Sequence, residues 1–189
     1  MVKIMKIIDN LWNCFLLKYY KVNIGENFKC EGRLVIQGHG YYSIGNNVYI
    51  ISKEFVNPIG GNRTVLQTMD GGKIIVGDNV GISHAILSAR DEIIIEDNVL
   101  IGAGTKIYDN DFHSIEYQYR NENPDTHIRK KKIKISKGAF IGAHSIILKG
   151  VTIGENSVVG AGSVVTHDVP NGEIWAGNPA KKCFSIDRR

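Results

Sequence analysis

The strongest hydrophobic pattern in the chain repeats every six residues, between Ile135 and Pro170. An aliphatic residue opens each repeat, and a small or β-branched residue follows four positions later. The first set is Ile135, Ile141, Ile147, Ile153, Val159 and Val165, and the second is Ala139, Ser145, Val151, Ser157, Ser163 and Val169. This period fits neither an α-helix nor the alternation of a simple strand. It is typical of a parallel β-helix, in which short strands and turns repeat around a triangular coil.

A turn signature extends the same architecture toward the N-terminus. Four-residue turns that begin with Ile or Val end at Asn27, Asn47, Asn79, Asn98 and Asn156, while Gly104, His144 and Gly162 take the same position in other repeats. A tight corner needs a residue that tolerates positive φ, and Gly and Asn tolerate it best. We therefore predict one continuous all-β coil over residues 23–170.

Two segments interrupt this period. Residues 51–72 contain Pro58 and two consecutive glycines, and we predict an inserted loop there. Residues 112–132 are polar and end in a basic cluster, and an irregular excursion of this length from a regular scaffold is usually functional or disordered. The period ends at Pro170, so residues 171–189 are expected to form a tail that folds back over the last coil.

Residues 1–22 are expected to contain an amphipathic helix. Its apolar positions are spaced as one helical face: Ile4, Ile7, Ile8, Leu11, Trp12, Phe15 and Leu16. An open coil end must be covered, so capping is the simpler role for this helix. The alternative is a peripheral membrane contact, in which Lys3, Lys6 and Lys18 would face lipid headgroups.

Composition narrows the choice of function only modestly. The chain has 189 residues and a net charge of +4, which would suit an anionic ligand but is too weak to indicate nucleic acid. Its cysteines are Cys14, Cys30 and Cys183, without CxxC spacing, so a reducing, cytoplasmic location is expected. No apolar run is long enough for a membrane-spanning helix.

His113 is the strongest candidate for catalysis. It ends the segment Asp109-Asn110-Asp111-Phe112-His113, where the regular coils stop. An imidazole has an unperturbed pKa of about 6.5, so it can accept a proton from a hydroxyl at neutral pH. A general base also needs a partner that orients its other nitrogen, and Asp109, Asp111 or a backbone carbonyl could serve. The alternative is a surface histidine in a polar loop.

Other residues carry weaker signals. His84 interrupts a coil where a small residue is expected, which suggests a place in a pocket. His144 is explained by its corner position. No two histidines lie close together in the sequence, so no metal site is predicted, and no motif for a covalent nucleophile is present. Direct transfer between two bound substrates is therefore favoured.

Residues 72–181 resemble the left-handed β-helix acyltransferases built from hexapeptide repeats, and most of all the sugar and polysaccharide O-acetyltransferases. The resemblance rests on the segments GKIIVGDNVGISHAILSARDEIIIEDNVLIGAGTKIYDNDFHSI and FIGAHSIILKGVTIGENSVVGAGSVVTHDVPNGEIWAGNPAK. It implies a homotrimer with active sites between neighbouring subunits. It also implies acetyl-CoA as co-substrate, without a metal.

The same resemblance assigns individual residues. It makes His113 the general base and places an oxyanion-binding amide near Gly142 and Ala143. It implies acetyl-CoA contacts at Phe140, Gly142, Ala143, Ala161, Thr166, His167 and Lys181. His167 stands where relatives often carry Lys, and Lys182 could compensate. Acceptor contacts are expected at Ser83, His84, Asp91 and Asp111.

The sequence therefore predicts an acetyl-CoA-dependent O-acetyltransferase that acts on a hydroxyl of a sugar or glycan precursor. Two alternatives stay open. One is an O-acetyltransferase for antibiotics or other xenobiotics, since it would use the same coil chemistry. The other is a catalytically inactive scaffold subunit with the same repeats.

Overall fold

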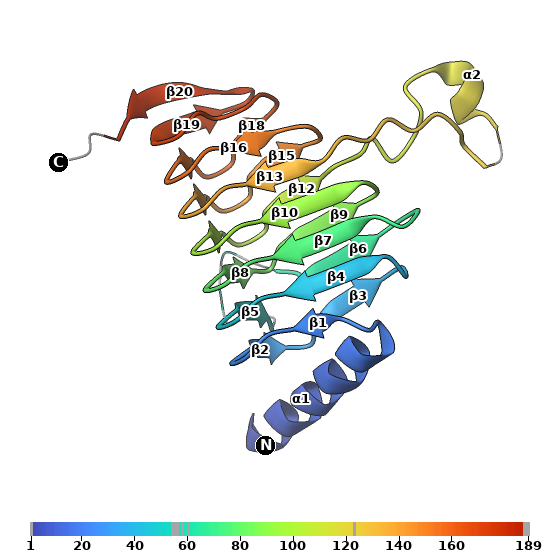
Figure 1. Cartoon of the computed structure of the whole chain (residues 1–189), viewed down its shortest axis with the longest axis vertical. Helices are drawn as coiled ribbons and strands as arrows, with labels where there is room; N and C mark the ends of the chain where they lie inside the picture. The colour runs from blue at the N-terminus through green and yellow to red at the C-terminus, as the bar shows by residue number, and fades with distance from the viewer. Residues whose placement is uncertain (1, 54–56, 58, 60, 123, 187–189) are drawn as a thin grey trace.

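Three β-sheets, built mainly from parallel strands, form a column in the computed structural model (Figure 1). The chain runs through the three sheets one after another. The structure describes residues 2–53, 57, 59, 61–122 and 124–186, and side chains from residue 4 onward. Parts of the expected 51–72 loop and of the tail therefore lie outside the described residues. The expected all-β architecture with parallel pairing is confirmed.

From β1 to β18, successive strands belong to sheets A, B and C in turn, so each turn of the chain adds one strand to each sheet. Sheet A contains β1 (Asn23–Ile24), β4 (Tyr41–Ile44), β7 (Lys73–Val76), β10 (Glu92–Ile95), β13 (Ile133–Ile135) and β16 (Thr152–Ile153). Sheet B contains β2 (Lys29–Gly32), β5 (Tyr49–Ser52), β8 (Gly81–Ser83), β11 (Leu100–Ile101), β14 (Phe140–Ile141), β17 (Val158–Val159), β19 (Glu173–Gly177) and β20 (Ala180–Ser185). Sheet C contains β3 (Val35–Gln37), β6 (Val65–Thr68), β9 (Ile86–Ala89), β12 (Lys106–Tyr108), β15 (Ile146–Leu148) and β18 (Val164–Val165).

The six-residue period corresponds to the interior of this column. Ile135, Ile141, Ile147, Ile153, Val159 and Val165 are all fully buried. The small residues between them have a second role, because three of them are serines with buried side chains. Ser157 Oγ donates to the Pro170 carbonyl (2.6 Å) and Ser163 Oγ to the Gly160 carbonyl (2.6 Å). The hydroxyl groups thus satisfy corner carbonyls that a β-coil leaves without strand partners.

Corner positions have the predicted backbone conformation. Asn27, Asn47, Asn79, Asn98 and Asn156 have φ between +55° and +58°, and His144 has φ of +59°. The Asn27 side-chain amide donates to Asn47 Oδ1 and the Asn47 amide to Asn79 Oδ1, each at 3.1 Å. Asparagine therefore serves both the local φ and the stacking of successive coils.

Because the strands are parallel, two edges of sheet C can be defined for the whole column. The B–C edge is where sheet B strands end and sheet C strands begin, and it includes residues 53–64, 84–85, 102–105, 142–145 and 160–163. The C–A edge is where sheet C strands end, and it includes residues 90–91, 109–132, 149–151 and 166–168. Strands β5 and β6 occupy parts of the expected 51–72 loop, so the connection itself is shorter, from 53 to 64.

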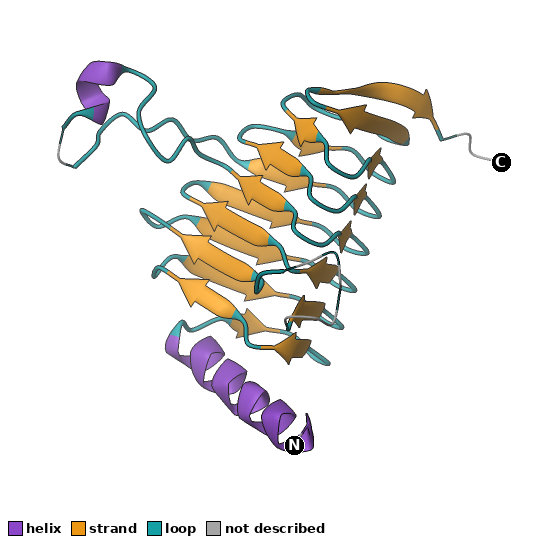
Figure 2. Cartoon of the chain, turned by 180° about the vertical axis from the view of Figure 1, so that it is seen from behind, coloured by secondary structure: helices purple, strands orange, loops and turns teal. Residues whose placement is uncertain are grey.

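Residues 112–132, called the arm, leave the column at the C–A edge and carry the short helix α2 (Tyr117–Arg120). The arm and the β19–β20 hairpin extend from opposite sides of the column (Figure 2). Strand β19 continues sheet B beside β17, and β20 returns antiparallel to it. The tail residues 171–185 are therefore mostly a hairpin.

Helix α1 (Val2–Tyr19) lies across the N-terminal end of the column (Figure 1). It contacts the first coil through Asn13, Leu16 and Leu17, which are buried. The Asn13 side chain donates to the Gly32 carbonyl (2.8 Å) and accepts from the Leu34 amide (2.9 Å). One polar side chain thus satisfies two backbone groups at the open end. The apolar face expected from the sequence is not packed on the coil: most of its residues are exposed.

The three cysteines differ in exposure, which predicts different reactivities. Burial raises the pKa of the Cys30 thiol to about 12, whereas Cys14 and Cys183 are exposed. Because the thiolate is the reactive species, a thiol reagent at pH ~8 should modify Cys14 and Cys183 well before Cys30. Peptide mass spectrometry over time measures the order, and denaturant should abolish it. Equal labelling rates in the folded protein would contradict this environment for Cys30.

Candidate functional site

The C–A edge is organised by the buried carboxylate of Asp109. Its Oδ1 accepts from the Arg90 amide (2.7 Å) and its Oδ2 from the Asp91 amide (2.8 Å). The Asn110 side-chain amide donates to Oδ1 as well (3.0 Å). Both carboxylate oxygens are therefore engaged with the preceding coil. Asp109 is not the orienting partner of His113, which was one of the sequence-based expectations.

Asp111 is also engaged. Its Oδ1 lies 2.5 Å from Lys149 Nζ on the next coil, while its Oδ2 is buried without a hydrogen-bond partner among the described residues. The expectation that Asp111 orients His113 is therefore wrong as well. Because one oxygen is paired with Lys149 and the other is buried, the structure gives no support to the expected acceptor contact of Asp111.

A tight turn then directs the chain outward. Phe112 has φ of +60°, and its ring packs edge-on against Tyr108 with centroids 5.0 Å apart. The neck of the arm is closed by backbone hydrogen bonds from Asp111 N to Arg129 O (3.1 Å) and from Lys131 N to Asp109 O (2.8 Å). These contacts hold His113 just beyond the column.

His113 and Asp125 form a histidine–carboxylate pair. His113 Nδ1 lies 3.0 Å from Asp125 Oδ2, and the Ser114 amide donates to both oxygens of the same carboxylate. A carboxylate only accepts, so Nδ1 is the donor and Nε2 is left to take up a proton. The Asp125 side chain is 14% exposed and that of His113 is 72% exposed. The base candidate is thus both oriented and accessible.

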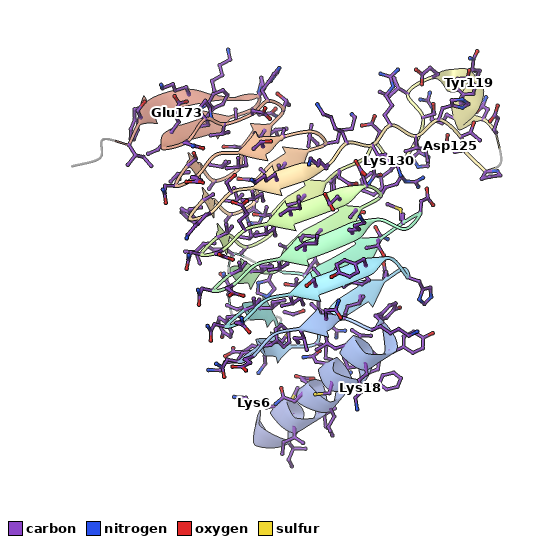
Figure 3. All side chains as sticks on the ribbon, viewed as in Figure 1. Lys6, Lys18, Tyr119, Asp125, Lys130 and Glu173 are labelled. Atoms are coloured by element: carbon purple, nitrogen blue, oxygen red, sulfur yellow. The ribbon has the colours of Figure 1, made fainter. Side chains whose placement is uncertain are left out.

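The outer part of the arm carries Asp125. It lies near Tyr119, and Lys130 lies nearer the base of the arm (Figure 3). The His127 ring stacks on Tyr119 with centroids 3.8 Å apart, which fixes the fold of the arm's outer part. Sequence reasoning missed Asp125, because twelve residues of irregular chain separate it from His113 and no periodicity predicts where it returns.

Three more of the expected site residues, Asp91, Thr166 and His167, lie at the C–A edge on coils close to the one that carries this pair. Strand β12 pairs with β15 and β15 with β18, so Thr166 and His167 lie two coils from Asp109. Thr166 Oγ1 and His167 Nδ1 are 2.8 Å apart. Asp91 lies one coil away on the other side. Asp91, Asp111, His113, Thr166 and His167 therefore share one edge.

Gly142, Ala143 and Ala161, which are also expected to contact acetyl-CoA, lie at the B–C edge. Close packing requires a glycine at position 142, because a Cβ atom there would lie 2.5 Å from the Ala161 amide nitrogen. The Gly142 amide donates to the Val159 carbonyl (2.8 Å). Within the described part of the chain, the amides of Ala143 and Ala161 donate to no protein group. Two N–H groups at this edge are thus available to a ligand.

Phe140 and Lys181, which are also expected to contact the cofactor, are exposed, whereas Lys182 is paired within the protein. Phe140 is 44% exposed on the outer face of sheet B, between Leu100 and Val158. Lys181 is exposed on β20. Lys182, expected to compensate for His167, instead lies 2.6 Å from Glu173. The Lys182 ammonium group, together with the Trp175 indole, lowers the pKa of the Glu173 carboxyl group. The charge of Lys182 is therefore already paired with that of Glu173.

Ser83 and His84 are occupied by the 53–64 connection. Asn57 donates its side-chain amide to Ser83 Oγ (3.2 Å). His84 is buried, with Nδ1 3.2 Å from Ser83 Oγ and Nε2 3.0 Å from the Lys53 carbonyl. Both ring nitrogens have protein partners, so the expected acceptor contact of His84 is not supported. His84 instead anchors the connection to the corner.

The candidate residues therefore fall into two groups at opposite edges of sheet C. The base candidate lies where sheet C strands end, and the free amides of Ala143 and Ala161 lie where they begin. One chain alone does not bring these groups together. Among the described residues, no cluster of three or more His, Cys, Asp or Glu side chains could hold a metal ion. Nor does any helix among them have the length and apolar character needed to cross a membrane.

Comparison with known proteins gives a consistent picture. A family model for the hexapeptide repeat of succinyl-transferase matches residues 92–107 and 132–167. Proteins of Staphylococcus aureus named as acetyltransferases are 43% identical over 75 residues, which is 40% of this chain and 36% of the relative, so the match spans about a third of their length. Galactoside O-acetyltransferase of Escherichia coli is 29% identical over 174 residues, covering 92% of this chain and 68% of the relative.

Solved structures agree with this family. The N-acyltransferase AntD from Bacillus cereus, in complex with dTDP and coenzyme A, is 27% identical with a TM-score of 0.73, covering 92% of this chain and 89% of that one. A galactoside acetyltransferase in complex with coenzyme A is 26% identical with a TM-score of 0.58, covering 87% of this chain and 65% of that one. In its repeats, its parallel coil and its sequence, the chain is therefore similar to the hexapeptide-repeat acetyltransferases.

Proposed function

We propose that the chain is an acetyl-CoA-dependent O-acetyltransferase that acts on a hydroxyl group of a sugar or glycan precursor. The observation that carries the proposal is the His113–Asp125 pair at the neck of the arm. A hydroxyl is a poor nucleophile until a base removes its proton, whereas a neutral amine is not. An oriented imidazole with one free nitrogen therefore favours a hydroxyl acceptor.

The reaction proceeds by direct attack. The acceptor oxygen bonds to the thioester carbonyl carbon while its proton passes to His113 Nε2. A free backbone amide such as that of Ala143 donates to the carbonyl oxygen as it becomes negative. When the tetrahedral intermediate collapses, the carbon–sulfur bond breaks and the departing thiolate takes the proton from His113. The base thus returns to its starting state after each transfer.

The active site is shared between subunits of a homotrimer of left-handed coils. The proposal is supported by the separation of the candidate residues: the C–A edge of one subunit supplies His113, and the B–C edge of its neighbour supplies Ala143 and Ala161. The arm projects from the column at the C–A edge (Figure 2). In such a trimer, it would reach beside the neighbouring subunit. Phe140 and Lys181 would lie along the same groove toward the nucleotide end of acetyl-CoA.

Acceptor-dependent release of coenzyme A tests the reaction. Purified protein is given acetyl-CoA and a panel of sugars, nucleotide sugars, amino sugars and antibiotics, and the free thiol is followed by absorbance. We expect release with a hydroxyl-bearing sugar, and mass spectrometry should show an acetyl ester. Turnover only with amines or antibiotics, or acetyl-CoA binding without any transfer, would contradict the proposal.

Mixed oligomers test the shared site. Subunits carrying His113→Ala are co-expressed with subunits carrying Ala161→Trp, which fills the B–C edge. If the site is shared, some interfaces combine an intact C–A edge with an intact B–C edge, so mixed trimers should be more active than either variant alone. Activity no greater than the two single variants would place the whole site within one chain.

A further inference from the structure

Helix α1 turns its most apolar face away from the protein. Ile7, Leu11 and Phe15 are 59%, 66% and 62% exposed. The same side of the helix carries further exposed apolar residues: Ile4, Met5, Ile8, Trp12 and Tyr19. A contiguous apolar surface of this kind, at the extreme end of the column, is unusual for a free surface and marks an interaction site.

The opposite face of α1 fixes this orientation. Leu16 and Leu17 are buried against the first coil, and Asn13 bonds to the backbone at Gly32 and Leu34. Turning the apolar face inward would break both Asn13 hydrogen bonds and bury polar groups without partners. The exposed face is therefore a consequence of how the helix caps the coil.

Charges around the exposed face are cationic. Lys18 and Lys21 are exposed at the C-terminal end of the helix, whereas Lys6 lies on the coil side, where it lines a hollow with Asn13 and Leu17. The one acidic residue of the helix, Asp9, bonds to Arg33 at 2.9 Å and its side chain is 16% exposed. Arg33 also lies over the Trp12 ring, 5.7 Å from its centroid. The surface thus offers apolar and aromatic side chains with positive charge at its C-terminal end.

We propose that this face docks on an anionic lipid surface, with α1 lying in the plane of the interface. Apolar side chains would enter the headgroup–acyl boundary and the lysines would contact phosphate groups. The same face is poorly suited to a second copy of itself, because α1 offers lysines while its one carboxylate, Asp9, is already paired with Arg33. The inference concerns the helix alone and does not depend on the proposed reaction.

Vesicle co-sedimentation tests the docking. The full chain is mixed with vesicles of phosphatidylcholine containing phosphatidylglycerol, or of phosphatidylcholine alone, at low and high salt. We expect binding to the anionic vesicles that weakens with salt. The double variant Leu11→Gln/Phe15→Gln should lower the partition coefficient at least roughly 10- to 100-fold, since two large apolar side chains lose their burial.

A matched control uses Phe184→Gln, because Phe184 is also 59% exposed but lies on β20 at the other end of the column. It should bind vesicles like the wild type. Light scattering is measured on the same samples. Absence of wild-type binding, equal loss in the Phe184 control, or a change of oligomeric state in the α1 variant would each overturn the proposal. The last outcome would make the face a subunit contact.

Discussion

Replacing His113 with alanine is expected to lower kcat for acetyl transfer by roughly 10²- to 10⁴-fold, the range for loss of a positioned general base. The fold should not change, because the His113 side chain is largely exposed and, among the described residues, it bonds to Asp125. The KM for acetyl-CoA should change little, since the expected cofactor amides lie at the other edge of sheet C. Initial rates of coenzyme A release at saturating acceptor measure the effect.

Two variants in the same arm sharpen this result. His127→Ala removes another histidine, which stacks on Tyr119 and has no place in the proposed reaction, and it should keep most of the activity. Asp125→Asn should lower kcat less than His113→Ala does, and it should cause no further loss when His113 is already alanine. Full turnover by His113→Ala, or additive losses in the double variant, would show that the pair does not act as the base.

The regular part of the fold could be predicted from the sequence because it depends on local repetition. Each buried aliphatic residue and each positive-φ corner can be predicted from its own six-residue repeat. A wrong prediction in one repeat therefore does not change the prediction for the next. The interior residues from Ile135 to Val165 and the corner at His144 show this directly. The same logic makes His113 a candidate for the site, because it stands where repetition stops.

What could not be predicted depends on contacts that repetition does not encode. Asp125 returns to His113 through an irregular arm, and only the folded neck at Asp111 and Lys131 fixes that return. The sequence suggests a pocket position for His84, but its ring nitrogen bonds to the Lys53 carbonyl instead. Helix α1 is amphipathic, but Asn13 rather than its apolar stripe decides which side meets the coil. In each case a polar hydrogen bond outweighs the hydrophobic pattern.

Asp109 shows how the same polar contacts support both the fold and the site, and its replacement is expected to have the largest effect on stability. Asp109→Ala removes a buried acceptor from the amides of Arg90 and Asp91. Hydrogen bonds to a charged group contribute about 1.5–3 kcal/mol each. The variant also avoids the cost of burying a carboxylate, so we expect a net loss of about 2–4 kcal/mol in the free energy of unfolding.

Asp168→Ala provides the matched control, because Asp168 accepts from the Thr152 amide (2.7 Å) at the same edge but is exposed. Solvent can replace that bond, so its loss should cost about 1 kcal/mol or less. Urea unfolding with fitted m-values separates the two. Equal destabilisation would mean that burial of the Asp109 carboxylate is not what holds this corner. Because Asp109 begins the segment that carries His113, its alanine variant should also lose activity at temperatures where the Asp168 variant remains active.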